Sequence, residues 1–231
     1  MNYVIWNNKD SRDINGLLIC ELPPITKPKM RVKETVIDGV DGSIIEELGY
    51  EPYDKSMTVG LKIGANVDEI IEYFTGSGEI IFSNEPNKYY KASIINGVNY
   101  DRLLRYRKAI VTFRVQPFKY DCTETELRAT SASERLIVSN IGNYKSKPII
   151  TVKGSGKIYL IVNGTTVCDY EFPNGDNTVI IDSEKQDAYF GSDLKNRTMN
   201  GEFPVLDKGE NILTWSGNVE SISVKHYSRW L

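Results

Sequence analysis

Short segments in which every second residue is apolar, separated by Gly, Pro, Asn and Asp, run along most of this 231-residue chain. In Ala109–Val115, for example, Val111, Phe113 and Val115 lie on one side of an extended chain and the more polar residues lie on the other. A period of two is the pattern of a β-strand with one buried face, so the chain is predicted to be mainly β. In the first half, strands are predicted at residues 14–22, 30–36, 57–63, 78–83, 89–95 and 109–115.

A helical period appears at residues 66–75. Asn66 is the predicted N-cap, Glu69 stands three residues later as in a capping box, and Gly76 follows as a C-terminal stop. The apolar residues are spaced at i, i+3, i+4 and i+7, which places them on one face of a helix. They are Val67, Ile70, Ile71 and Phe74. We therefore predict one α-helix that covers a sheet.

The chain exceeds the usual length of one domain and turns polar in its middle. We predict an N-terminal β domain at 1–120, a linker at 121–134 and a C-terminal domain at 135–231. Apolar runs without helical spacing recur in the last part, which is typical of an antiparallel β-sandwich. They lie at 136–138, 148–152, 157–162, 166–172, 178–181, 211–215 and 219–224, and Asn163-Gly164 predicts a type I′ turn between two of them.

Charge and composition argue against several classes of partner and cellular location. Lys and Arg number 28 against 31 Asp and Glu, so a net charge of -3 provides no basic field for nucleic acid or anionic lipid. The N-terminus lacks the pattern of a secretory signal, and no apolar run reaches the roughly 18–20 residues of a membrane helix. Three cysteines without metal-type spacing predict reduced thiols in a protein made in a cytosol.

Sequence motifs for catalysis are incomplete. His226 is the single histidine, and a place on a strand surface is the ordinary explanation for it. Gly154–Lys157 lacks the first glycine and the hydroxyl residue of a phosphate-binding loop. Ser192–Lys195 has the S-x-x-K spacing without its companion motifs, and Asp38 and Asp41 fit a turn better than a calcium loop. We expect no enzyme, no metal and no cofactor.

Three other readings stay open at this stage. Trp215, Tyr227 and Trp230 are candidates for a sugar-stacking platform, although packing in a sandwich explains such aromatics as well. A basic cluster at 102–108 includes an aromatic residue and suits either phosphates or an acidic neighbour. Carboxylates such as Glu46-Glu47 are candidates for glycoside hydrolysis, which depends on their separation in space.

Several segments follow one another in the order found in a known family. In this order they resemble the distal tail proteins of long-tailed phages (siphophages), the component that joins the tail tube to the tip. The segments are the first strand with Trp6, the turn at 38–42, the helix followed by 78–86, then 88–92 and 111–120, and in the second half 140–148, 208–211, 216–219 and 228–231.

The resemblance implies an N-terminal β domain with one helix, a C-terminal galectin-like antiparallel β-sandwich and a structural role. It further implies a homo-hexameric ring at the virion tail tip, synthesised in the host cytoplasm. The implied partners are other copies of the chain, the tail tube protein and a tail-associated hub or lysin protein. DNA passes through such a ring without specific binding, and no membrane is involved.

A closed ring requires each subunit to meet its neighbour through two unlike surfaces. The segment Pro23–Pro28 contains three prolines and cannot continue a central strand ladder, because proline has no N–H to donate. We expect it to form an exposed extended arm or edge that a neighbour contacts.

Overall fold

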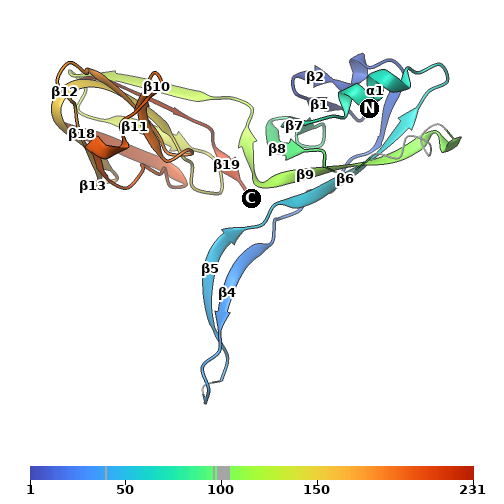
Figure 1. The fold of residues 1–231 in the computed structure, drawn as a ribbon, viewed down its shortest axis with the longest axis horizontal. Coiled ribbons are helices and arrows are strands. Elements are labelled where there is room, and N and C mark those ends of the chain that lie inside the picture. Colours follow the sequence, from blue (N-terminus) through green and yellow to red (C-terminus); the bar gives the residue numbers. More distant parts are fainter. Residues whose placement is uncertain (40, 96, 98–104) are drawn as a thin grey trace. The chain divides into compact units, whose positions relative to one another are not determined.

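The computed structural model describes residues 1–39, 41–95, 97 and 105–231. The chain divides into two compact units, the first formed by residues 1–120 with Leu231 and the second by residues 121–230 (Figure 1). The predicted mainly β class, with a helix in the N-terminal part, is confirmed.

The first unit contains a sheet in which the strands follow the order β2-β1-β7-β8-β9-β6-β3. β4 and β5 pair with each other as a separate two-stranded sheet. The turn predicted at residues 38–42 joins these two strands, and Gly39 and Gly42 have φ angles of 83° and 89°; Val40 lies outside the described residues. The elements are β1 (Val4–Trp6), β2 (Lys9–Asp10), the 3₁₀ turn η1 (Ser11–Asp13), β3 (Leu17–Glu21), β4 (Met30–Thr35), β5 (Ile44–Tyr50), β6 (Tyr53–Leu61), α1 (Val67–Tyr73), β7 (Ser77–Phe82), β8 (Lys88–Ser93) and β9 (Lys108–Asp121).

Helix α1 begins as the sequence predicts. The side chain of Asn66 accepts hydrogen bonds from the backbone N–H groups of Asp68 and Glu69 at 3.2 and 3.5 Å. This cap satisfies two of the N–H groups that a helix N-terminus leaves without partners. Ile70 and Phe74 are buried in the core of the unit, whereas Ile71 is partly exposed.

Aromatic rings fill the core of the first unit around Phe113 of β9. The ring of Phe113 meets those of Trp6, Phe82 and Phe74 edge to face, with centroids 5.3, 6.0 and 6.3 Å apart. The cluster packs rings from β1 and β7, and the ring that follows α1, against β9. Edge-to-face pairs add to the stabilisation that burial of the rings provides.

The second unit is built on two long strands that pair with each other, β12 (Ile149–Val162) and β18 (Gly209–His226). The other elements are β10 (Thr125–Thr130), β11 (Leu136–Asn140), β13 (Thr165–Glu171), β14 (Thr178–Asp182), β15 (Asp187–Phe190), β16 (Asp193–Leu194), the 3₁₀ turn η2 (Asn196–Thr198), β17 (Met199–Gly201) and β19 (Arg229–Trp230). Asn163 and Gly164 both have positive φ angles, 52° and 81°, in the turn between β12 and β13, as a type I′ turn requires.

β12 and β18 each change neighbours halfway along. The first half of β12 pairs with β14 and the second half with β13, while β18 pairs first with β11 and later with β10. The register between the two long strands shifts at Gly154 and again before Tyr159. Strands that bend at such irregularities pass from one layer of a sandwich to the other. Apolar residues from both halves, such as Val152 and Leu160, meet in one core.

The structure corrects the predicted linker at 121–134. Residues Thr125–Thr130 form β10, which pairs with β18 over six residues and belongs to the second unit. Leu127 and Ala129 face inward, whereas Glu126 and Arg128 are exposed. The strand lies at one end of the sheet path, so half of its side chains are polar and the stretch resembles a linker.

Candidate assembly surface

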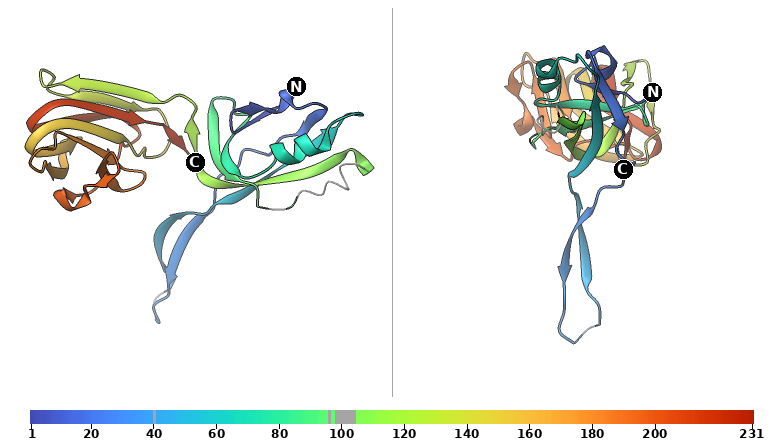
Figure 2. Two further views of the ribbon diagram at one scale, coloured as in Figure 1. Left: turned by 45° about the horizontal axis from the view of Figure 1, so that its top comes forward. Right: turned by 90° about the vertical axis from the view of Figure 1, so that its right-hand side faces the viewer.

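The hairpin of β4 and β5, here called the arm, is exposed along its length. All described residues from Arg31 to Leu48 are exposed. Figures 1 and 2 show the arm as a narrow ribbon that extends beyond the sheet of its own unit. A two-stranded hairpin is marginally stable by itself in water, because nothing covers its faces.

Apolar side chains occupy both faces of the arm. The register pairs Val32 with Glu47 and Glu34 with Ile45, so Val32 and Ile45 share one face. Ile44 lies on the other face, opposite Thr35. Ile44 and Ile45 are 59% and 61% exposed, and Val36, Ile37 and Leu48 are exposed as well. A ribbon with apolar groups on both faces is suited to insertion between two surfaces of a partner.

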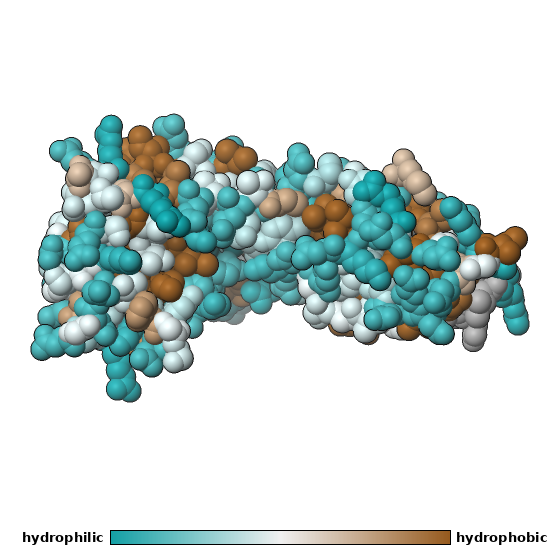
Figure 3. Space-filling view, turned by 90° about the horizontal axis from the view of Figure 1, so that it is seen from above, coloured by the Kyte–Doolittle hydropathy of each residue, from teal (hydrophilic) through white to brown (hydrophobic). Residues whose placement is uncertain are grey.

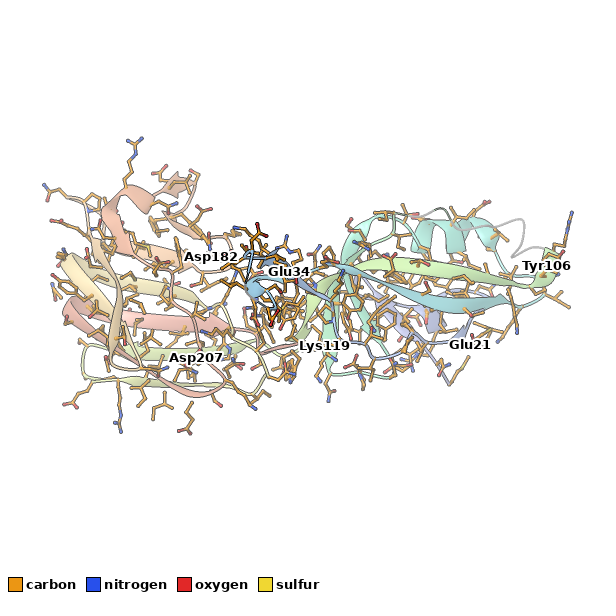
Figure 4. All side chains as sticks on the ribbon, turned by 90° about the horizontal axis from the view of Figure 1, so that it is seen from below. Glu21, Glu34, Tyr106, Lys119, Asp182 and Asp207 are labelled. Carbon is orange, nitrogen blue, oxygen red and sulfur yellow. The ribbon has the colours of Figure 1, made fainter. Side chains whose placement is uncertain are left out.

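The arm is also acidic. Residues 30–50 contain five carboxylates and two basic residues, a net charge of -3, equal to that of the whole chain. Lys33 and Glu46 form an ion pair at 3.6 Å with both side chains largely exposed, which stabilises the hairpin little. Figure 4 labels Glu34, another of these carboxylates, on the arm. A surface complementary to the arm would therefore combine apolar contacts with basic groups.

The proline-rich segment expected to be an arm is instead the base of this arm. Pro24–Lys27 are exposed, whereas Pro23 and Pro28 are buried. Side chains of the same unit bind the carbonyl groups of Pro23 and Pro24, at 3.0 and 2.7 Å. The backbone here is thus held by its own unit, while the side chains of Pro24–Lys27 stay exposed, as do those of the hairpin beyond.

On the face shown in Figure 3, hydrophilic side chains predominate and apolar ones form separate small patches. Three open hollows in the surface have volumes of about 320, 340 and 420 Å³ and mix polar with apolar lining residues. The first is lined partly by Arg12 and Lys62, the second by Glu79 and Lys91, and the third by Glu171 and Arg197. Each of these three hollows has at most one carboxylate, whereas glycoside hydrolysis requires a pair.

The three aromatic residues considered for sugar stacking lie at different places along the end of the second unit's chain, and each is partly buried. Trp215 lies in the middle of β18, partly buried against the core of the second unit. Tyr227 and Trp230 follow the end of that strand.

The remaining candidate residues are dispersed. Glu46 and Glu47 point to opposite faces of β5, as successive strand residues do. In the basic cluster, Arg102 lies outside the described residues and Arg107 is exposed, with its guanidinium donating to the carbonyl of Lys62. His226 is buried, contrary to the expected place on a strand surface.

The described residues offer neither a metal site nor a membrane-spanning helix. In this part of the chain, no group of three His, Cys, Asp or Glu side chains is placed to hold a metal ion. Its helices are also too short or too polar to cross a membrane. The thiol of Cys168 is buried, and that of Cys20 is partly exposed.

No protein-family model and no curated protein matches the chain. Among solved structures, the Dit protein (gp 19.1) of phage SPP1 aligns over 100% of both chains with a TM-score of 0.72 and 16% identity. That protein is described as a paradigm of the hub adsorption apparatus in phages that infect Gram-positive bacteria. Two structures of the phage P2 baseplate in its activated conformation, with Ca and with Sr, align with TM-scores of 0.47 and 0.45 at 8% identity, over 98% and 97% of both chains.

The resemblance to distal tail proteins noted in the sequence is confirmed at the level of the fold. The agreement covers both units, since the alignment with the SPP1 protein leaves no part of either chain out. Over its whole length, the chain has the fold of the SPP1 Dit protein.

Proposed function

We propose that this chain is a distal tail protein, a structural component of a phage tail tip that assembles into a ring. The observation that carries the proposal is the arm, a long exposed hairpin with apolar side chains on both faces. The fold shared with the SPP1 hub protein supports the same conclusion. In this role the chain acts through shape and self-association, without catalysis.

The arm is compatible with a head-to-tail ring. An arm that docks on a different surface of the next copy makes a heterologous interface, and such interfaces repeat until the ring closes. Six copies are the number that the resemblance implies. The ring would join the tail tube protein to the hub or lysin protein at the virion tail tip, with the C-terminal sandwich, galectin-like in this proposal, outside the ring-forming domain.

The test is to image the purified protein by negative-stain microscopy and to weigh it by native mass spectrometry. We expect six-membered rings, at high concentration or with the tube protein added. The double variant Ile44→Asp with Ile45→Asp should lose the rings, because it places charges on both faces of the arm. Its own fold should be retained, since substitutions at exposed sites usually change stability by less than about 0.5 kcal/mol.

Lys33→Gln is the matched control, because it lies on the same hairpin and removes only the exposed ion pair with Glu46. It should form rings as the wild type does. A wild-type protein that stays monomeric at every concentration and does not bind the tube would refute the proposal.

A further inference from the structure

The segment that leads into the arm has backbone carbonyl groups that side chains must supply with hydrogen-bond donors. Residues 22–29, here called the strap, connect β3 to β4 and include Pro23, Pro24 and Pro28. The strap does not form a strand, so its carbonyl groups are not bound by a regular ladder. The backbone N–H of Glu51 binds the carbonyl of Lys29 at 2.8 Å, and side chains supply the donors further back along the strap.

Three side chains of the first unit bind strap carbonyls. The ammonium group of Lys55 donates to the carbonyl of Pro24 at 2.7 Å, and the amide of Asn84 to that of Pro23 at 3.0 Å. The hydroxyl of Tyr53 donates to the carbonyl of Thr26 at 3.4 Å. Lys55 makes the shortest of these contacts and is the charged donor, so it should contribute most to holding the strap.

Lys55 occupies a position that ordinarily takes an apolar residue. β6 alternates, with Met57 and Val59 buried on the same face as Lys55, which is only 3% exposed. The rings of Tyr90, Phe82 and Tyr53 surround its ammonium group, with centroids 5.0, 5.7 and 5.8 Å away. These rings stabilise the cation by cation–π attraction but replace only part of its lost hydration.

Glu85, the carboxylate that acts electrostatically on Lys55, is bound by other side chains. Glu85 receives the ammonium group of Lys119 and the hydroxyl of Tyr90, both at 2.5 Å. Lys119 is labelled on β9 in Figure 4. Burial raises the pKa of Glu85, but the hydrogen bonds from Lys119 and Tyr90 outweigh burial and lower it overall. Among the described residues, no carboxylate lies within ion-pair distance of Lys55, and its partner is the strap.

The charge on Lys55 lowers the stability of the folded protein. Burial lowers its pKa to about 8, with the neighbouring Lys119 lowering it further and Glu85 opposing both. A depressed lysine pKa means that the folded protein binds the proton less tightly than the unfolded chain does, so at neutral pH the charge reduces stability. An apolar side chain of similar length would fit the aromatic walls without this loss.

We propose that Lys55 is a positioning residue for assembly: its buried ammonium group anchors the strap and so holds the base of the arm in the orientation that a neighbouring copy receives. The inference rests on the proposed ring, because it assigns Lys55 to the arm that forms that ring. It also explains why a charged residue stands among aromatic rings on the inner face of β6.

The variant Lys55→Met keeps the length of the side chain and removes the donor and the charge. We expect its unfolding midpoint in urea to equal or exceed that of the wild type. Hydrogen exchange of the Glu51 amide in the monomer should become about tenfold faster, the effect of losing a charge-assisted hydrogen bond at the base of the arm. Ring yield at a fixed concentration should fall.

Two further variants make the result specific. Lys62→Met places the same change on an exposed lysine just after β6 and should behave as the wild type. Asn84→Ala removes the neighbouring strap donor without touching the buried charge, and it should also accelerate exchange at Glu51.

The outcomes separate this inference from the proposed function. If Lys55→Met unfolds or is clearly less stable than the wild type, Lys55 serves the fold and the inference is wrong. Unchanged exchange together with normal rings would overturn it as well. Absence of rings in the wild type would refute the proposed function, whereas the exchange measurement would still decide whether Lys55 anchors the strap.

Discussion

Lys55 and His226 are buried ionisable side chains at strand positions where the alternation would place an apolar one. Lys55 continues the inward row of Met57 and Val59 in β6, and His226 continues that of Ile222 and Val224 in β18. Lys55 has a defined partner in the strap, as argued above. His226 differs, because neither of its ring nitrogens makes a hydrogen bond to the described residues.

His226 should make the second unit sensitive to acid. Burial lowers the pKa of His226 below its usual 6.5, although the nearby backbone of Tyr227 and the carboxylate of Asp121 act in the opposite direction. The unfolded chain therefore takes up a proton near pH 6.5 while the folded chain stays neutral. Stability should be complete above that pH and fall as the pH drops towards the folded pKa, by at most about 1.4 kcal/mol per unit.

Urea unfolding at pH 7.5 and pH 5.5 measures this effect. His226→Phe keeps a planar ring of similar size and should lose less stability between the two pH values than the wild type does. An equal loss in both proteins would mean that other groups cause the acid sensitivity.

At the scale of elements, glycines decide where the two long strands of the second unit change layers. Gly154 and Gly217 lie at the change, and a Cβ atom at either position would meet a backbone carbonyl of the partner strand, that of Asn218 or of Lys157. The sequence predicted the two halves of β12, and likewise those of β18, as separate strands. A turn that ends a strand and a bend within a continuous, paired strand look alike in sequence, because both use Gly, Ser and Asn.

Gly217→Ala should destabilise the second unit more than the replacement of a positive-φ glycine in open space does. Gly217 has a φ of 95° and contacts the partner backbone, whereas Gly175 has a φ of 93° with open space around it. Gly175→Ala should cost about 1–2 kcal/mol from backbone strain alone. Chemical unfolding of both variants compares the two costs, and equal losses would show that the close approach at Gly217 does not matter.

At the scale of the molecule, each unit has its own hydrophobic core. Trp6, Phe82 and Phe113 belong to the first core, and Ile150 and Leu160 to the second. Because the two cores share no residues, each unit should unfold in its own cooperative transition.

A fragment of residues 121–230 should therefore fold alone. We expect it to give a β-type circular dichroism spectrum and one cooperative unfolding transition at the position of one transition of the whole chain. A fragment that remains unfolded would show that the second unit depends on the first for its stability.

The local pattern of the chain determined which segments became strands and where the helix lies. Alternation identified β6, β7 and β9, and the capping residue with an apolar stripe located α1, because both signals arise from residues close in sequence. β5 was missed because it is exposed on both faces, and β10 because half of its side chains are polar. In neither strand does one side carry a continuous apolar row.

Only the tertiary structure decided which strands pair, where β4 and β5 leave the sheet and what surrounds Lys55. The carbonyl of Pro24 lies 31 residues away from Lys55 in sequence, and Asn84 reaches the same strap from 61 residues away. Such contacts depend on how segments distant in sequence pack together, and a local sequence pattern does not encode the free energy of that packing. Alternation shows that a side chain points inward, but the partners it meets there are a property of the folded chain.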